Sequence, residues 1–145
     1  MFEGTIGYTG PSSFPISITW NTMFAGFDQK GNSFDAAGNY VNFAGADSAK
    51  QAFSTYIELG YTTGPAAFFL GFTPWSGYYN NYGLTAFDPT ASKKTFSVVN
   101  VGVTLSRSVK ITSDYSLPLR ATLAINPAAS YKRMDYIHLI FGITF

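Results

Sequence analysis

The sequence predicts an all-β fold, an antiparallel up-and-down transmembrane β-barrel with about seven strands in this chain. Large apolar residues alternate with smaller or more polar ones through the final stretch, residues 134–145, which is typical of a strand with two unlike faces. Aromatic residues make up 18% of the chain and charged residues only 12%, about half the usual charged share of ~25%. No run approaches the ~18 apolar residues of a membrane-spanning helix, so a closed barrel is the fold that would satisfy the backbone in lipid.

Composition also limits the classes of function. At 145 residues the chain fits one domain, here a single outer-membrane barrel domain over 1–145. It has no cysteine, which excludes disulfides, thiolate metal sites and thiol nucleophiles. The net charge of +1 gives no electrostatic footprint for nucleic acid. Met1 leads directly into a strand without the basic and apolar regions of a signal peptide, so we expect a mature form or a piece of a longer protein.

The first four strands are expected at residues 2–9, about 14–25, about 51–62 and about 66–75. The first three have one apolar and one polar face, as Ile18 and Trp20 alternate with Thr19 and Asn21 in the second. The fourth is apolar on both faces, which leaves its orientation open. Turns rich in Gly and Pro at 10–13 and 63–65 join these strands into two hairpins.

The last three strands are expected at about 95–106, 115–126 and 134–145. In the fifth, Val101 and Val103 alternate with Asn100 and Thr104. A modest turn at 108–114 and a loop at 127–133 connect them. Seven strands therefore account for the chain outside its loops.

The connections alternate in length. They are short at 10–13 and 63–65 but long at 26–50, where a short hairpin is expected around residues 40–43, and at 76–94. Outer-membrane barrels have short turns on the periplasmic side and longer loops outside. A soluble up-and-down barrel shares the strand pattern but would face its apolar residues inward, and it remains a third alternative.

Strand parity predicts that the barrel is larger than this chain. In the expected topology the first and the seventh strand run in the same direction, whereas single-chain bacterial barrels have an even number of antiparallel strands. We therefore expect this chain to be the C-terminal part of an even-stranded barrel of about 12 strands. Direct pairing of residues 2–9 with 134–145 in a closed ring would contradict this expectation.

Thirteen polar residues are expected to face the inside of the barrel, and eleven of them are the candidate pore-lining set. These are Glu3, Thr19, Asn21, Tyr56, Glu58, Asn100, Thr104, Arg120, Thr122, Tyr136 and His138; the other two are Thr5 and Ser17. Such residues would line water in a wide barrel and form a hydrogen-bonded plug in a narrow one. Glu58 and Arg120 could set up a field across the lumen, although pairing with neighbours or solvation is the simpler interpretation.

A second set of residues is aromatic and is expected to form a girdle at the membrane–water interface. Its members are Tyr8, Phe14, Trp20, Phe53, Tyr61 and Trp75. Tyr78, Tyr79 and Tyr82 lie in the second long loop, where an ordered loop packed over the barrel mouth is favoured over a sugar site.

Neither catalysis nor metal binding is expected, so the prediction is that the chain is not an enzyme and has no cofactor. His138 is the only histidine, and the polar residues expected near it, Thr122 and Asn126 among them, include no serine that could complete a triad. One histidine without a carboxylate cluster is poor metal ligation. No phosphate-binding glycine loop is present.

Several segments resemble porins of Bacteroides-type Gram-negative bacteria, a family of outer-membrane β-barrel proteins, in their C-terminal portion. The matching segments are FEGTIGY (2–8), ITWN (18–21), STYIELGY (54–61), FTPW (72–75), VVNV (98–101), SLP (116–118) and FGITF (141–145). The resemblance implies a signal peptide and further strands before this region, an outer-membrane location and no catalytic residues. It also implies that Phe141 and Phe145 act as an assembly signal, recognised by the barrel-assembly machinery through the C-terminal strand.

The expected function is passive diffusion of small solutes across the outer membrane. The alternative is a non-conducting barrel that serves as a structural or accessory subunit of an outer-membrane complex. The expected partners are the lipid bilayer, the assembly machinery and other outer-membrane subunits, with no nucleic acid.

Overall fold

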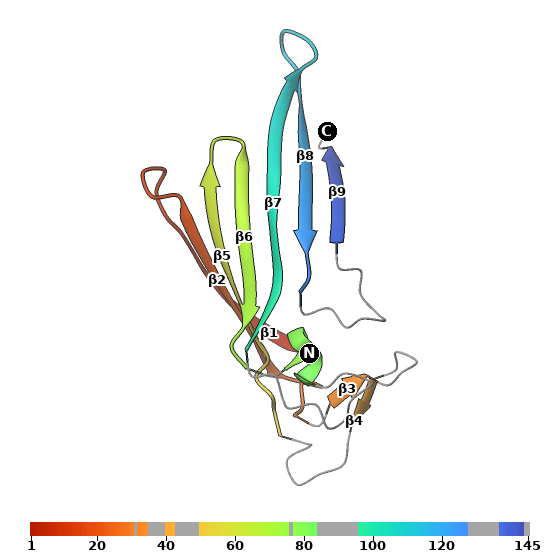
Figure 1. Ribbon diagram of the computed structural model, residues 1–145. Coiled ribbons are helices and arrows are strands. Elements are labelled where there is room, and N and C mark those ends of the chain that lie inside the picture. The colour runs from red at the N-terminus through yellow and green to blue at the C-terminus, as the bar shows by residue number, and fades with distance from the viewer. Residues whose placement is uncertain are drawn as a thin grey trace.

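Seven antiparallel strands form one sheet in the computed structural model, which describes residues 1–30, 32–34, 40–42, 50–75, 77–83, 96–127 and 137–143 (Figure 1). The strands are β1 (Phe2–Thr9), β2 (Ile16–Ala25), β5 (Thr55–Thr63), β6 (Ala66–Thr73), β7 (Ser97–Lys110), β8 (Ser116–Ile125) and β9 (Ile137–Ile143). Neighbouring strands pair in the order β1-β2-β5-β6-β7-β8-β9, so only the five inner strands have a partner on both sides. The all-β, up-and-down architecture predicted from the sequence is therefore confirmed.

Two small elements lie at the end of the sheet that carries the long connections. Strands β3 (Asn32–Phe34) and β4 (Tyr40–Asn42) form a separate two-stranded ribbon. The hairpin expected around residues 40–43 therefore begins earlier in the sequence, and residues 40–42 supply only its second strand. The 3₁₀ helix η1 (Tyr78–Gly83) lies in the connection between β6 and β7. No helix in the described ranges is long and apolar enough to cross a membrane.

The strand boundaries differ most from the sequence prediction at two places, by four residues each, and elsewhere by about two residues. The third predicted strand begins at Thr55 instead of residue 51, because Phe53 has a φ of 53° and the extended conformation cannot continue through it. Strand β7 continues to Lys110, so the turn after it lies four residues beyond the predicted strand end at 106. The β7–β8 hairpin consequently projects beyond the β1–β2 and β5–β6 turns (Figure 1).

The sheet is open, because β1 and β9 form its two edges and do not pair with each other. The closed barrel predicted from the sequence is thus not formed by the described strands alone. With seven strands in strict alternation, β1 and β9 run in the same direction. The direct pairing that would have contradicted the larger-barrel hypothesis is not observed.

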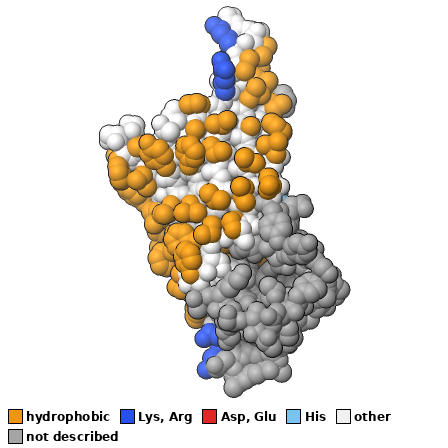
Figure 2. All heavy atoms as spheres, in the orientation of Figure 1, with side chains coloured by type: hydrophobic (Ala, Val, Ile, Leu, Met, Phe, Trp, Pro, Cys, Tyr) orange, Lys and Arg blue, Asp and Glu red, His pale blue; other side chains and the backbone are white. Residues whose placement is uncertain are grey.

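The register separates two chemically different faces. Directly paired residues lie on the same face, and the pairs Ile6–Trp20, Leu59–Leu70 and Leu123–Leu139 belong to one side. We call this side the apolar face. Its exposed large members include Ile6, Tyr8, Ile18, Trp20, Leu59, Tyr61, Phe68, Leu70, Val101, Leu105, Leu119, Leu123, Ile125, Ile137, Leu139, Phe141 and Ile143. Ile57, Val103 and Leu117 lie on the same side and are half-buried. Figure 2 shows hydrophobic side chains spread over the face of the sheet toward the viewer.

Almost no hydrophobic side chain is buried. Of the described residues, Met23 and Ala52 are the only buried hydrophobic ones, whereas the fully buried side chains are polar: Asp28, Ser54, Thr55 and Thr73. The described residues thus form no apolar core against the apolar face.

On the opposite side, the polar face, small residues allow large ones to pack across the strands. Gly102 on β7 pairs with Phe69 on β6, and a Cβ at Gly102 would contact the Phe69 ring, the Leu123 carbonyl oxygen and the Ala124 Cα. Aromatic rings that cover cross-strand glycines in this way help to fix strand register. Phe69 thereby resolves the orientation of β6, which its sequence left open.

Candidate functional site

The candidate site is the polar face of the sheet. The register places on it every described member of the predicted pore-lining set: Glu3, Thr19, Asn21, Tyr56, Glu58, Asn100, Thr104, Arg120, Thr122 and His138. Tyr136 lies outside the described residues. The alternation of polar and apolar residues was sufficient to predict this group, because successive side chains of a strand point to opposite faces of the sheet.

Hydrogen bonds between neighbouring strands connect many of these side chains. Thr5 Oγ1 donates to Asn21 Oδ1 across β1 and β2 (2.7 Å). The hydroxyls of Thr104 and Thr122 lie 2.8 Å apart across β7 and β8. These bonds are separate cross-strand pairs on the polar face.

Tyr56 is the centre of a further group of hydrogen bonds on the polar face. Its hydroxyl lies 2.5 Å from Glu58 Oε2 and 3.0 Å from Asn100 Oδ1, which reaches over from β7. The intervening residue on β6 is Gly71, where a Cβ would collide with both the Tyr56 hydroxyl and the Asn100 side chain. Gly71 is thus the gap that lets a β5 side chain meet a β7 side chain.

Helix η1 lies over the loop end of the polar face. Tyr79 stacks on Tyr56 with a ring-centroid distance of 5.4 Å, and its hydroxyl donates to Glu3 Oε1 on β1 (2.5 Å). Burial, followed by the hydrogen bond to the Glu3 carboxylate, raises the pKa of Tyr79 above its ordinary value of 10.0. The Tyr79 hydroxyl is therefore a stable donor, and Tyr79 connects η1 to β1 and β5.

A buried polar cluster supports η1 from below, and the sequence did not predict it. Asp28 is fully buried and accepts hydrogen bonds from the Ser54 backbone N–H (2.8 Å), the Ser54 hydroxyl (2.5 Å) and Gln51 Nε2 (3.2 Å). The Ser54 hydroxyl in turn accepts the Tyr78 N–H (2.7 Å). Asp28 thereby connects the segment after β2, the segment before β5 and η1.

The cluster continues through Asn80. Its Oδ1 accepts the Gly77 N–H (2.8 Å), and its Nδ2 donates to Ser97 Oγ at the start of β7 (3.3 Å). The only sequence signal was a run of Gly, Asn and Asp, which predicts turns but not which of them meet. The cluster is a structural support for the loop end, since its polar groups are satisfied by one another.

Glu58 and Arg120 are not brought together. Glu58 accepts a hydrogen bond from the Tyr56 hydroxyl. It pairs with Gly71 on β6, which in turn pairs with Asn100 on β7. Arg120 pairs with Ser106, six residues further along β7. The two charges thus lie on the same face but in different rows, with Glu58 nearer the loop end.

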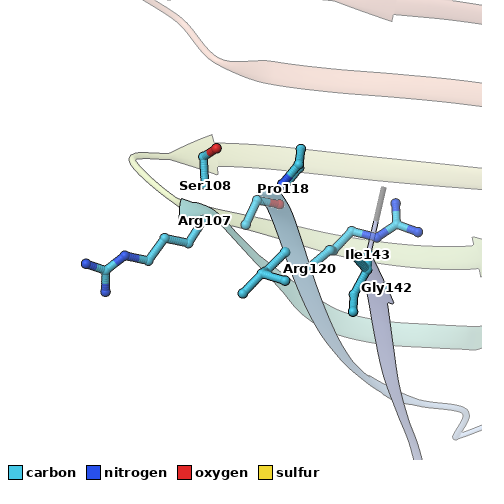
Figure 3. Close-up of a pocket in the computed structure, with 8 residues that line it drawn as sticks. Arg107, Ser108, Pro118, Arg120, Gly142 and Ile143 are labelled. Atoms are coloured by element: carbon cyan, nitrogen blue, oxygen red, sulfur yellow. The ribbon is translucent and has the colours of Figure 1, made fainter. Parts of the chain in front are cut away.

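Arg120 lies across Gly142 of β9, where an added Cβ would be 3.6 Å from the Arg120 Nε. A hollow of about 470 Å³ is lined there by residues of the β7–β8 hairpin and β9, including Ser106, Arg120 and Gly142. Figure 3 shows Arg107 and Arg120 pointing in opposite directions from the sheet. Arg120 therefore belongs to the polar face, and Arg107 does not.

His138 has a structural partner. Its Nε2 lies 2.9 Å from Asn126 Nδ2, which is a donor, so this ring nitrogen accepts. Its strand partner Ala124 brings no nucleophile. Among the described residues no group of three His, Cys, Asp or Glu side chains could hold a metal ion.

The predicted girdle residues are all exposed but occupy three levels. Tyr8, Phe14 and Tyr61 lie at the short-turn end, and Phe53 and Trp75 lie at the loop end. The Trp75 indole N–H donates to the Phe53 carbonyl oxygen (2.9 Å). Trp20, in contrast, lies in the middle of β2, and its indole donates to Thr22 Oγ1 (2.8 Å).

The predicted assembly signal is described only in part. Phe141 projects from the apolar face of edge strand β9, and Phe145 lies outside the described residues. In comparisons with known proteins, no family model, no curated protein and no solved structure matches this chain.

Proposed function

We propose that this chain forms part of a porin-like β-barrel in the outer membrane of a Gram-negative bacterium, where small solutes diffuse passively along its polar face. The observation that carries the proposal is the exposed apolar face on a sheet with almost no buried hydrophobic residue. Exposing a Leu, Ile or Phe side chain that could be buried costs about 1.5–3 kcal/mol each in water. Lipid would remove that cost without requiring a second layer of protein.

The strand lengths support a membrane location. The seven strands contain between 7 and 14 residues, and most contain 8 to 10. A tilted strand needs about 9–11 residues to cross a bilayer. The apolar face is therefore about as tall as the hydrocarbon layer it would contact.

Further strands would complete the barrel. Edges β1 and β9 are unpaired and run in the same direction, so closing them onto each other would need a parallel pair. An odd number of additional strands restores antiparallel pairing throughout, which agrees with an even-stranded barrel of about 12 strands. In lipid such closure is required, because an open edge leaves backbone groups without hydrogen-bond partners.

The polar face supports a water-filled interior. It carries hydroxyl, amide and charged side chains from every strand, with Glu3 and Glu58 on β1 and β5 and Arg120 and His138 on β8 and β9. Such a lining is compatible with hydrated solutes of either sign. No single ligand site is needed for passive diffusion.

A second candidate is a non-conducting barrel that serves as a structural subunit of an outer-membrane complex. It is favoured by the position of η1, since Tyr79 stacks on Tyr56 and bonds Glu3 across the loop end of the polar face. Phe69 adds bulk to the same face. A lumen that these side chains occupy could lack a continuous path for water.

Conductance distinguishes the two candidates. The full-length barrel that contains this chain, purified and refolded into planar lipid bilayers, is expected to give discrete channel openings. Heat-denatured protein at the same concentration is the control. Insertion without openings would leave the structural barrel, and failure to associate with lipid vesicles in a flotation assay would overturn both.

A further inference from the structure

One charged side chain interrupts the apolar face. Arg107 pairs with Leu119 on β8 and lies between Leu105 and Val109 on its own strand, so it shares their face. No other charged residue lies on the apolar face within the described strands. In the described part of the chain, the exposed Arg107 guanidinium has no hydrogen-bond or ion-pair partner.

A hollow lies beside Arg107. Its volume is about 510 Å³, and its lining on the apolar face includes Leu105, Arg107, Leu119, Ala121 and Phe141. Ser106, Arg120 and Gly142, which belong to the polar face, also border it. In the register, Leu105, Ala121 and Phe141 form one row, with the small Ala121 between two large side chains. The next row toward the short turns is Arg107, Leu119 and Ile143. The apolar face therefore has a depression at Ala121, and the Arg107 guanidinium lies at one end of this depression.

The height of Arg107 matches the membrane surface under the proposed function. The Ser106 N–H donates to the Pro65 carbonyl oxygen in the β5–β6 turn (2.8 Å), so Arg107 lies just beyond the level where that hairpin ends. Further out on the same hairpin are the exposed Ile111 and Tyr115. An arginine at this level meets lipid phosphates, whereas Leu105 and Ala121 remain at the level of acyl chains.

We propose that Arg107 and the hollow at Ala121 form a binding site for an anionic phospholipid. The guanidinium bonds the phosphate, since its planar donors match phosphate geometry. One acyl chain lies in the depression over Ala121, between Leu105 and Phe141. The proposal rests on the proposed membrane location and adds a lipid preference at one place on the barrel wall.

The test measures lipid selectivity with the full-length barrel that contains this chain, folded into phosphatidylcholine vesicles that contain a minor fraction of phosphatidylglycerol. Electron spin resonance of spin-labelled lipids gives the association constant of each headgroup at the protein. Wild type is expected to prefer phosphatidylglycerol about five-fold, the effect of one cation near the lipid surface. Arg107→Gln is expected to lose most of this preference.

Two variants separate the site from general electrostatics. Ala121→Leu fills the hollow and keeps Arg107, so it is expected to reduce the preference. Lys110→Gln removes a charge from the same strand but from the polar face, where Lys110 pairs with Ser116, and is expected to leave the preference unchanged.

The remaining outcomes contradict the proposal in distinguishable ways. If the protein floats with phosphatidylcholine vesicles but associates equally with both headgroups, the lipid site is wrong. The proposed membrane location is not contradicted by that result. A Lys110→Gln effect as large as that of Arg107→Gln, or an Ala121→Leu variant with full preference, would also overturn the site. A chain that does not float would overturn both proposals.

Discussion

The Tyr79 hydroxyl of η1 donates a hydrogen bond to Glu3 Oε1 on edge strand β1, although the two residues are 76 positions apart. Removing that hydroxyl with Tyr79→Phe should loosen η1 while the ring stack on Tyr56 remains. Because both groups are partly exposed, we expect a modest effect of about 1 kcal/mol. Chymotrypsin cleavage at residues 78–79 of the folded protein should become roughly five-fold faster, the factor that corresponds to this energy.

A matched control for this variant is Tyr8→Phe, which removes a hydroxyl from the apolar face at the other end of β1. Its cleavage rate in η1 should equal that of wild type. Equal rates for Tyr79→Phe and wild type would show that the hydrogen bond to Glu3 does not hold η1 in place.

The same hydroxyl predicts a pH dependence. Burial and the Glu3 carboxylate raise the pKa of Tyr79 above 10.0. A group whose pKa is raised on folding contributes stability that is complete below its unfolded pKa and is lost as the pH rises above it. The stabilisation of η1 by Tyr79 should thus be constant below about pH 10 and decline above it. In a pH titration that follows tyrosinate absorbance, Tyr79→Phe should remove absorbance change from the high-pH end of the curve. A loss at the low-pH end of the curve would be inconsistent with this prediction.

Asp28 and Ser54 should be energetically coupled. Asp28→Asn replaces one carboxylate oxygen with a donor that faces the Ser54 N–H or hydroxyl, and we expect it to cost about 2 kcal/mol, in the range for hydrogen bonds to charged groups. Ser54→Ala removes a donor to Asp28 and the acceptor of Tyr78 N–H. Because both changes break the same bonds, the double variant should cost less than the sum of the singles. Denaturant unfolding in vesicles measures all three values, and strict additivity would refute the coupling.

Two glycines on the polar face should respond differently to alanine. At Gly102 the new Cβ would meet the Phe69 ring and the Leu123 carbonyl oxygen, whereas at Gly7 the nearest atoms would be 3.9 Å away. We expect Gly102→Ala to lower the free energy of unfolding by about 1–3 kcal/mol, as overpacking does. Gly7→Ala should change it by less than about 0.5 kcal/mol. Equal values for the two variants would show that Phe69 does not need the space at Gly102.

Cysteine accessibility along β8 should alternate. The chain has no native cysteine, so single substitutions can be labelled without background. In vesicles, Thr122→Cys and Ala124→Cys should react with a charged, water-soluble maleimide, whereas Ala121→Cys and Leu123→Cys should react only with a lipid-soluble one. The opposite pattern would support the soluble barrel with an apolar interior.

Sequence periodicity was sufficient to predict the seven strands and the two faces, because side-chain orientation in a strand depends only on position. The structure differs from the sequence prediction where a single backbone torsion or a long-range contact determines the conformation. No pattern marks the positive φ of Phe53 that delays β5. The cluster around Asp28 joins residues 28, 54 and 80, and turn-forming residues reveal local bends but not which loops meet. The orientation of β6 likewise depended on Gly102, which lies on its partner strand.

The β7–β8 hairpin has ten residue pairs in continuous register around a short turn, the longest such run in the sheet. Loop-closure entropy is smallest for contacts that are near in sequence, and a hairpin of this kind forms within about 1–10 μs. We therefore expect β7–β8 to be the folding nucleus, onto which β6 and β9 add from either side. The same order would leave β1 for last, so that η1 reaches Glu3 only at the final step of folding.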